Sequence, residues 1–462
     1  MQDYYQQNPS ARWLALLSIC IATFLVPLSM SSVNLALPAI AADLHADAVK
    51  VSWMPTINLW GSMILMLPAG RVADMIGRKR VYLIGVMFYA LASLMVLAVN
   101  SIEWLLVARV LQGLASALVF ATAMAIVGSV FSDGDRGTAL GLTATSVYLG
   151  LTCGPLIGGW LTEFWGWRSV FWAPVPLTLL SLLLVVLYLK GEWKSEQRER
   201  LDWLGSGLFA LWTSLFFFGL SGLPEPRHGL LALLGLACLP LFIFQQNRAR
   251  YPLIRIRAMR DNRVFTRSIM ASLFMYGANY PILFLLSLYL QYIQGMSPGE
   301  SGQLILIQAL IMAALAPLAG RLSDRYEPRL IATAGCLLFG AGFATLFWLR
   351  QDSGLSHVVA GLVLLGIGFG LFSTPNNNAA LGSVPKERLS IASALLNLAR
   401  TLGNMFGMAV VVLLFNQLIG DRTIEPSQYP ALLTVTRLAL ALACGYTLIA
   451  AYNSFRRGNI RS

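Results

Sequence analysis

The sequence predicts an all-α integral membrane protein with fourteen spans, and three observations support that fold class. First, 57% of the 462 residues are hydrophobic and only 12% are charged, with a mean hydropathy of +0.68. In a soluble domain about a quarter of the residues carry charge. Second, uncharged runs long enough to cross a bilayer as helices recur along the whole chain. Third, one short charged motif occurs twice, once in each half.

The uncharged runs define the spans in chain order. Thirteen are continuous: 13–42, 51–70, 81–102, 110–132, 137–162, 169–189, 203–224, 229–247, 268–299, 301–320, 330–349, 353–385 and 438–455. A fourteenth, 389–420, is interrupted only by Arg400. An even number of spans places both termini on one side of the membrane. Because 25 of the 33 Lys and Arg residues lie on that side, the positive-inside rule predicts that both termini are cytoplasmic.

The charge and the cysteines exclude several classes of function. The net charge of +12 is spread over loops where membrane orientation explains it, so we expect no nucleic-acid partner. The five cysteines lie in apolar runs without metal-ligand spacing, and we expect no metal and no cofactor. The sequence has no His/Asp cluster that could bind a metal, no Gly-x-Ser-x-Gly motif that could present a serine nucleophile and no nucleotide-binding loop. These absences argue against an enzyme with catalytic residues. We expect no receptor function either, because the sequence shows no appended soluble domain of the kind that receptors carry. We expect the protein to be a monomer in the lipid bilayer.

The duplicated motif divides the chain into two halves. It reads Gly-Arg-x-x-Asp and involves Gly70, Arg71 and Asp74 in the first copy and Gly320, Arg321 and Asp324 in the second. The copies lie 250 residues apart, whereas six spans with short loops need only about 190. The additional residues between the two copies are enough to form two extra membrane-spanning helices. We therefore expect a six-helix bundle at 1–190, a two-helix insert at 191–250 and a second six-helix bundle at 251–462, the plan of a carrier with its site between repeated halves.

Several motifs resemble those of a known family. The loop "GRVADMIGRKR" at 70–80 resembles the signature between spans two and three of the major facilitator superfamily, and "RVLQG" at 109–113 resembles its fourth-span motif. Span five resembles the motif of the superfamily's exporters, and "VNLALP" in span one and "WGWRSVFWAPVP" before span six match its 14-span drug:proton antiporters, the multidrug efflux family. The resemblance implies the major facilitator fold, secondary active transport of a small-molecule substrate by alternating access, and a bacterial cytoplasmic (inner) membrane.

The first loop signature predicts a gate. Gly77 permits a tight turn between Asp74 and Arg78. The resemblance implies that this charge cluster, joined by Arg136, holds the halves together in the outward-facing state. An ordinary solvated loop is the alternative. We favour the gating role for the duplicated Gly-Arg-x-x-Asp residues.

Span five carries glycines spaced by four. Gly150, Gly154 and Gly158, with Gly159 beside them, line a helical face that lets another backbone approach. Packing alone explains such a face. Pro155 removes a backbone hydrogen bond and allows a bend, and the resemblance to exporters favours a functional hinge and seal.

Two arginines lie inside spans, where translocon scales give a central charge a cost of about 2.5 to 3.5 kcal/mol. Arg400 is the deeper of the two, and Arg109 lies nearer a span end. Each belongs to a polar stripe along its helix, so each is either a structural clamp satisfied by carbonyls or a contact for substrate or a moving helix. The predicted substrate cavity comprises Ser29, Asn34, Arg109, Gln112, Tyr276, Tyr280, Asn397, Arg400 and Asn404.

Two further patterns carry expectations. The stretch "STPNNNAALG" at 373–382 predicts a broken, hydrated helix end around Pro375 and the asparagines that follow it. In span one, relatives place an aspartate five positions before the asparagine of "VNxALP", and here that position is Ser29. No carboxylate lies in the middle of any span, so we expect a neutral to positive cavity that favours neutral or anionic amphiphiles.

The missing acid leaves two modes of transport open. Proton-coupled efflux of drug-like or amphiphilic metabolite molecules is what the resemblance implies, with protons as the coupling ion. Proton-independent uniport or exchange of a neutral or anionic metabolite is what Ser29 favours, since a proton-coupled carrier needs a group that changes charge.

Overall fold

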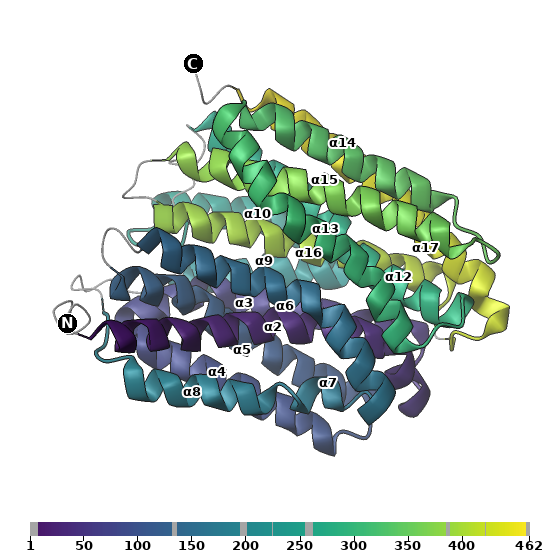
Figure 1. Ribbon diagram of the computed structural model, residues 1–462, viewed down its shortest axis with the longest axis horizontal. Helices are drawn as coiled ribbons and strands as arrows, with labels where there is room; N and C mark the ends of the chain where they lie inside the picture. Colours follow the sequence, from purple (N-terminus) through teal and green to yellow (C-terminus); the bar gives the residue numbers. More distant parts are fainter. Residues whose placement is uncertain are drawn as a thin grey trace. The chain divides into compact units, whose positions relative to one another are not determined.

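The computed structural model describes residues 8–131, 136–194, 201–223, 225–254, 262–384, 389–420 and 422–458. Within these ranges every regular element is helical (Figure 1), which confirms the all-α prediction. Thirteen described helices are long and apolar enough to cross a membrane. That count is close to the predicted fourteen, and α6, a helix of 30 residues, is the remaining long helix.

The helix bounds follow the uncharged runs. In the first part of the chain they are α2 Pro9–Asp43, α3 Ala48–Ile76, α4 Arg78–Met95, α5 Ile102–Val130, α6 Arg136–Trp165, α7 Ser169–Trp172 and α8 Val175–Tyr188. Then come α9 Trp203–Ser221 and α10 Pro226–Arg248. The later helices are α12 Arg263–Leu288, α13 Pro298–Arg325, α14 Pro328–Phe347, α15 Leu355–Gly382, α16 Leu389–Leu418 and α17 Tyr429–Arg456. A π-helical turn, Tyr289–Ile293, extends α12.

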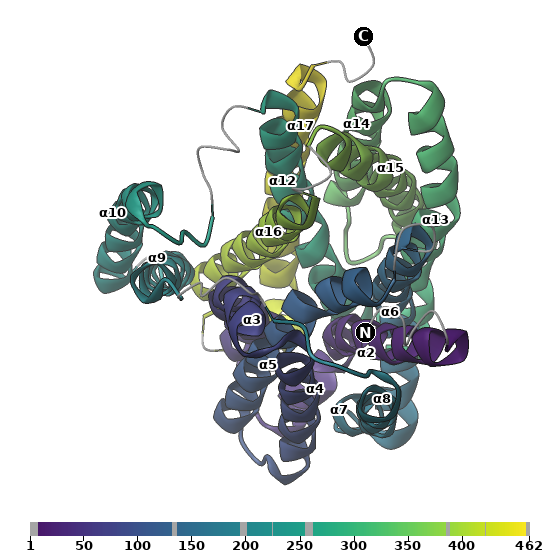
Figure 2. The ribbon, with the colours of Figure 1, turned by 90° about the vertical axis from the view of Figure 1, so that its left-hand side faces the viewer.

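The chain divides into two compact units. The first comprises residues 1–40, 53–214 and 235–254. Inside it α4 packs against α5 and α8 (Figure 2). A core cluster of this unit joins side chains of α2, α4, α5 and α8, among them Ile19, Tyr82, Val127 and Val185. The hydrophobic faces of these helices are thereby buried against one another.

The second unit comprises residues 41–52, 215–234 and 255–462. Here α14 packs against α15 and α17, and α12 packs against α16 and α17 (Figures 1 and 2). The α12–α16 contact is a backbone contact: a Cβ on Gly403 would lie 2.1 Å from the Leu273 carbonyl oxygen, and one on Gly407 would lie 2.1 Å from that of Gly277. Small residues allow membrane helices this close an approach.

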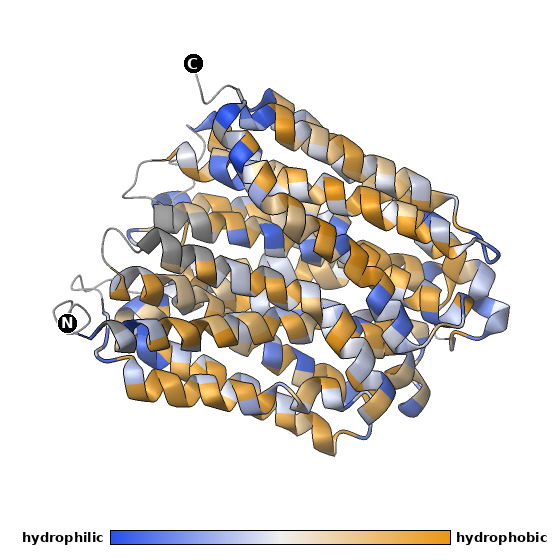
Figure 3. Ribbon diagram, viewed as in Figure 1, coloured by the Kyte–Doolittle hydropathy of each residue, from blue (hydrophilic) through white to orange (hydrophobic). Residues whose placement is uncertain are grey.

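The helices are apolar along most of their lengths, and hydrophilic residues gather towards the helix ends and connections (Figure 3). The predicted break in "STPNNNAALG" is wrong. Helix α15 continues through Pro375 to Gly382, and Asn376 is fully buried. The Asn376 amide donates to the Ser268 carbonyl (3.1 Å) and to Ser272 Oγ (2.8 Å) of α12, so this amide is satisfied by a neighbouring helix.

Candidate functional site

The polar seam of α2 faces the glycine-rich helix α6. The Ser31 hydroxyl donates to the Leu151 carbonyl at 3.2 Å, and the Ser32 hydroxyl donates to the Gly154 carbonyl at 2.8 Å. Pro155 lies four residues after Leu151 and has no N–H to give to that carbonyl. Ser31 therefore supplies the hydrogen bond that Pro155 cannot make.

The glycines of α6 complete the same contact. A Cβ on Gly150 would lie 2.2 Å from the Phe24 carbonyl oxygen, and one on Gly158 would lie 2.5 Å from the Ser32 Cα. On Gly154 it would lie 2.6 Å from the Ser31 Cβ. These distances leave no room for a side chain, so three of the predicted exporter-motif glycines are sites of helix contact. Pro155 and Gly159 are also buried.

Arg109 lies at the centre of a buried hydrogen-bond network. It is 1% exposed; its Nε donates to the Met54 carbonyl (3.3 Å) and its Nη1 to Gln112 Oε1 (2.8 Å). Gln112 in turn donates to Ser93 Oγ (2.8 Å), so α3, α4 and α5 are tied together. This geometry favours the clamp over substrate contact for Arg109.

Ser29 and Asn34 are both buried, each 1% exposed. Ser29 interacts with the Tyr89 hydroxyl, and that hydroxyl also lies in the electrostatic field of Arg109. The position where the family resemblance implies an acid is thus occupied by a serine beside Tyr89. A carboxylate there would have two groups to stabilise its charge.

The first loop signature forms a connected turn. Gly77 has φ 121°, which only glycine adopts readily. Arg78 pairs with Asp74 at 2.9 Å, and its Nη1 donates to Ser129 Oγ of α5 at 3.1 Å. The predicted turn is confirmed. The Arg136 side chain, the expected fourth member, lies outside the described part of the chain.

Glu192 is a member of this turn that the sequence analysis missed. Its Oε1 accepts from the Lys79 backbone N–H at 2.9 Å, and the carbonyl of Trp193 accepts from the Arg78 N–H at 3.1 Å. The segment after α8 therefore caps the beginning of α4. Its only signal in the sequence is an acid shortly after span six. The Nη2 of Arg71, the other charged residue of the motif, donates to the Pro252 carbonyl at 3.0 Å.

The second copy of the motif is built differently. Glu327 stands where the first copy has Gly77 and has φ −57°, and Pro328 begins α14. A Cβ on Gly320 would lie 3.4 Å from the Thr374 Cγ2, and Arg321 is exposed. The Asp324 side chain lies outside the described part. The duplication in sequence is therefore not a duplication of the turn.

Arg400 lies in a polar cluster of three helices. Its Nη1 donates to Asn397 Oδ1 (3.1 Å) and its Nη2 to Asn377 Oδ1 (2.5 Å). The guanidinium lies 5.1 Å from the Tyr276 ring of α12. Arg400 is about 16 Å along α16 from Leu389. Unlike Arg109 it is partly exposed, so the Arg400 cluster (Tyr276, Asn377, Asn397 and Arg400) presents charge and amide groups at mid-span. Asn377 was missed as a member of this cluster.

Two other residues predicted for the substrate cavity, Tyr280 and Asn404, belong to the same unit. Tyr280 is 6% exposed. In the described part of the chain the Asn404 Oδ1 has no hydrogen-bond partner.

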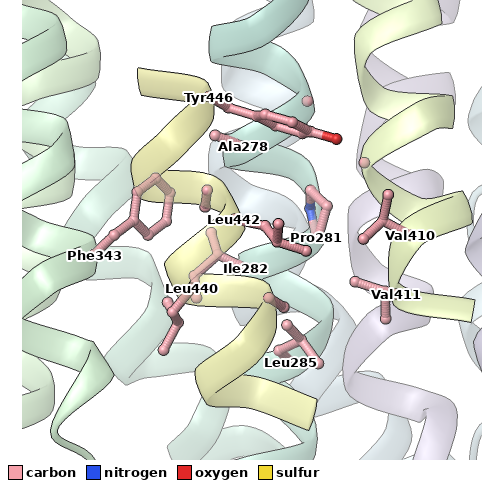
Figure 4. Close-up of a pocket in the computed structure, with 14 residues that line it drawn as sticks. Ala278, Pro281, Ile282, Leu285, Phe343, Val410, Val411, Leu440, Leu442 and Tyr446 are labelled. Carbon is pink, nitrogen blue, oxygen red and sulfur yellow. The ribbon is translucent and has the colours of Figure 1, made fainter. Parts of the chain in front are cut away.

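An apolar pocket lies between α12, α16 and α17, lined by residues such as Pro281, Val411, Leu442 and Tyr446, with Phe343 of α14 at one side (Figure 4). None of the predicted cavity residues lines this pocket.

A second buried arginine follows α17. Arg457 is 1% exposed and its Nη1 donates to Asn376 Oδ1 at 2.9 Å. Burial lowers the pKa of Arg457 to about 10, which leaves the guanidinium charged at neutral pH. This group ties α17 to α15, and through Asn376 to α12. The sequence offers no periodic signal for it because Arg457 looks like an ordinary residue of a basic tail.

Long apolar helices with polar side chains and arginines inside the spans are typical of one class of protein, the multi-pass membrane transporters of small molecules. The model of the Major Facilitator Superfamily matches residues 19–408, and the chain belongs to that superfamily.

Two curated relatives and one solved structure illustrate the match. The riboflavin transporter RibZ of Clostridioides difficile (strain 630) is 30% identical over 414 residues, covering 88% of this chain and 89% of RibZ. The tetracenomycin C resistance and export protein of Streptomyces glaucescens is 29% identical over 420 residues, covering 88% and 77%. A bacterial homolog of the human lysosomal transporter Spinster, inward-facing and unoccupied, has a TM-score of 0.71 at 17% identity over 97% of both chains, which shows the fold alone.

Proposed function

We propose that this protein is a secondary active transporter that exports drug-like or amphiphilic metabolite molecules across the bacterial cytoplasmic membrane by alternating access. Its termini are cytoplasmic in this proposal, as the distribution of Lys and Arg indicates. Curated relatives named for drug resistance and export support the direction.

The observation that carries the proposal is the Arg400 cluster. It places a guanidinium, two amides and an aromatic ring on one partly exposed site within a span. Every described Asp and Glu lies in a connection or within three residues of a helix end. A site with a cation and no opposing carboxylate favours neutral or anionic amphiphiles, since the guanidinium would repel an organic cation.

A ligand-stabilisation screen tests this preference. The melting temperature of the purified protein is measured with riboflavin as a neutral probe, fluorescein as an anionic probe and ethidium as a cationic probe. We expect the first two to stabilise wild type, and Arg400→Gln to abolish the effect of fluorescein.

Arg437→Gln is the matched control, because Arg437 is another arginine within a helix whose donors go to the Leu349 carbonyl. Stabilisation by ethidium alone would contradict the proposed substrate class.

Ser29 favours a second candidate function, proton-independent uniport or exchange. The hydroxyl is buried beside Tyr89 at the position where the family resemblance implies an acid, and a serine does not exchange a proton in the physiological range. Counterflow of fluorescein in proteoliposomes, with and without a pH gradient, separates the two modes. Equal rates favour exchange, and a rate that follows the gradient favours proton-coupled export.

A further inference from the structure

The end of α17 carries arginines and aromatic rings that the proposed transport function does not use. The Arg267 guanidinium of α12 lies 5.6 Å from the centre of the Tyr452 ring, and that of Arg456 lies 5.5 Å from the same ring. One turn further, the Arg329 guanidinium of α14 lies 5.6 Å from the Phe455 ring. Tyr452 and Phe455 are 52% and 53% exposed. Three helices thus bring their cations onto two outward-facing aromatic rings, here called the α17 basic cluster.

The charge of this cluster is poorly compensated. Among the residues that the structure describes, Arg267, Arg329 and Arg456 take part in no ion pair. Arg267 gives one bond, from Nη1 to Asn453 Oδ1 at 2.8 Å. Glu327 is the carboxylate whose field reaches Arg457 next to the cluster. One acid beside several guanidinium groups leaves a net positive site.

An apolar surface continues from the cluster along the same two helices. Seven residues beyond Arg267 and seven before Asn453, the Phe274 and Tyr446 rings lie 5.7 Å apart. Beyond this pair lies the apolar pocket (Figure 4). Its lining residue Leu442 is 45% exposed, so the pocket lies next to the exposed surface of α17.

The length of this surface matches a lipid tail. Gly277, which lines the pocket, lies ten residues beyond Arg267 in α12. Ten residues of helix rise about 15 Å, and half of a hydrocarbon core of about 30 Å is also about 15 Å. A molecule with its head at Arg267 and its tail parallel to α12 would reach the pocket.

We propose that the α17 basic cluster and the apolar pocket form a binding site for an anionic phospholipid. The phosphate binds Arg267 and Arg456, and one acyl chain lies along α12 and α17 against the apolar residues around the pocket. Basic pockets between membrane helices bind anionic headgroups, and aromatic residues are typical of the headgroup level. A soluble anion would use the arginines alone and would leave the apolar pocket without an occupant.

Native mass spectrometry of the purified full chain tests the site. The probes are dioleoyl-phosphatidylglycerol and dioleoyl-phosphatidylcholine, which share their tails and differ in charge. We expect wild type to retain phosphatidylglycerol in preference. The double variant Arg267→Gln/Arg456→Gln should weaken phosphatidylglycerol binding by about 30-fold, because each arginine near an anionic surface contributes about 1 kcal/mol. Binding of phosphatidylcholine should not change.

Arg248→Gln is the matched control, since Arg248 lies 4.3 Å from the Phe244 ring at the end of α10 and no other described arginine lies on that ring. Ala439→Phe fills the pocket and should weaken binding of the dioleoyl lipid but not of dihexanoyl-phosphatidylglycerol. If the double variant does not fold, Arg456→Gln alone serves, because Arg456 is exposed. Equal retention of both lipids by wild type, equal loss in Arg248→Gln, or displacement by inorganic phosphate would overturn the proposal.

Discussion

The two arginines inside spans differ in burial and in hydrogen-bond partners, and we propose that they serve different purposes. Arg109 is 1% exposed and its bonds go to groups within the first unit, whereas Arg400 is partly exposed and lies over Tyr276. Removing a buried donor leaves its acceptors unsatisfied. Removing a partly exposed cation leaves mainly a change of charge. The two positions should therefore respond differently to substitution.

Arg109→Gln is expected to lower the stability of the protein by about 1 to 2 kcal/mol, because the Met54 carbonyl and Gln112 lose their partner. Arg400→Gln is expected to change stability less and to remove stabilisation by fluorescein. Thermal unfolding in detergent, with and without that probe, measures both effects. Equal destabilisation by the two substitutions, with probe binding kept in both, would contradict the assignment of clamp and substrate contact.

Ser29→Asp is expected to make counterflow of fluorescein depend on the pH gradient. The new carboxylate would lie beside Tyr89 and in the field of Arg109, at a buried position where its charge changes with protonation. Ser29→Asn, with a similar volume and no titrating group, is the control. No response of the Asp variant to the gradient would show that the missing acid is not what separates the two modes of transport.

At the scale of elements, helices α2 and α6 are matched to each other by polar and small residues. Ser31 bonds to the carbonyl that Pro155 leaves open, and Gly154 and Gly158 leave room for Ser31 and Ser32. The polar seam of α2 is therefore a complementary surface for a helix that contains proline. If α6 bends at Pro155, the hydrogen bond from Ser31 to the Leu151 carbonyl must either break or move together with α6.

Gly158→Ala should destabilise the protein by about 1 to 3 kcal/mol, since the added methyl would overlap the Ser32 backbone. Gly445→Ala is the control: it lies within α17, and its added Cβ would have no neighbour within 4 Å. Thermal unfolding of the two variants is compared with wild type. A Gly158 variant as stable as the Gly445 variant would show that the α2–α6 contact is looser than described.

Asp74→Asn should shift the balance between inward- and outward-facing states, because the Asp74–Arg78 pair joins the end of α3 to the beginning of α4 and to α5. Cysteine accessibility from each side of the membrane measures the balance. Asp47→Asn is the control, since Asp47 forms a similar short-range pair with Lys50. Unchanged accessibility and unchanged transport would rule out a gating role.

For the molecule as a whole, the sequence predicted the helices well and their polar contacts poorly. Span lengths follow from the thickness of a bilayer, so uncharged runs mark α2 to α17 without any knowledge of packing. Side-chain partners depend on which helices meet. Asn376 was expected to be hydrated but is buried against α12. The contacts of Glu192 and Arg457 could not be predicted, because in the sequence both look like ordinary loop residues. The Gly-Arg-x-x-Asp motif is repeated in the sequence, but the glycine turn is not, because Glu327 stands in place of the glycine and Pro328 begins α14.

The central claim is that this member of the superfamily transports neutral or anionic amphiphiles through a site with a cation and no membrane acid. Its most direct test is uptake into proteoliposomes containing wild type, Arg400→Gln or no protein, with fluorescein and ethidium compared under identical conditions. We predict protein-dependent transport of fluorescein that Arg400→Gln abolishes, and none of ethidium. Protein-dependent transport of ethidium alone, unaffected by Arg400→Gln, would contradict the claim.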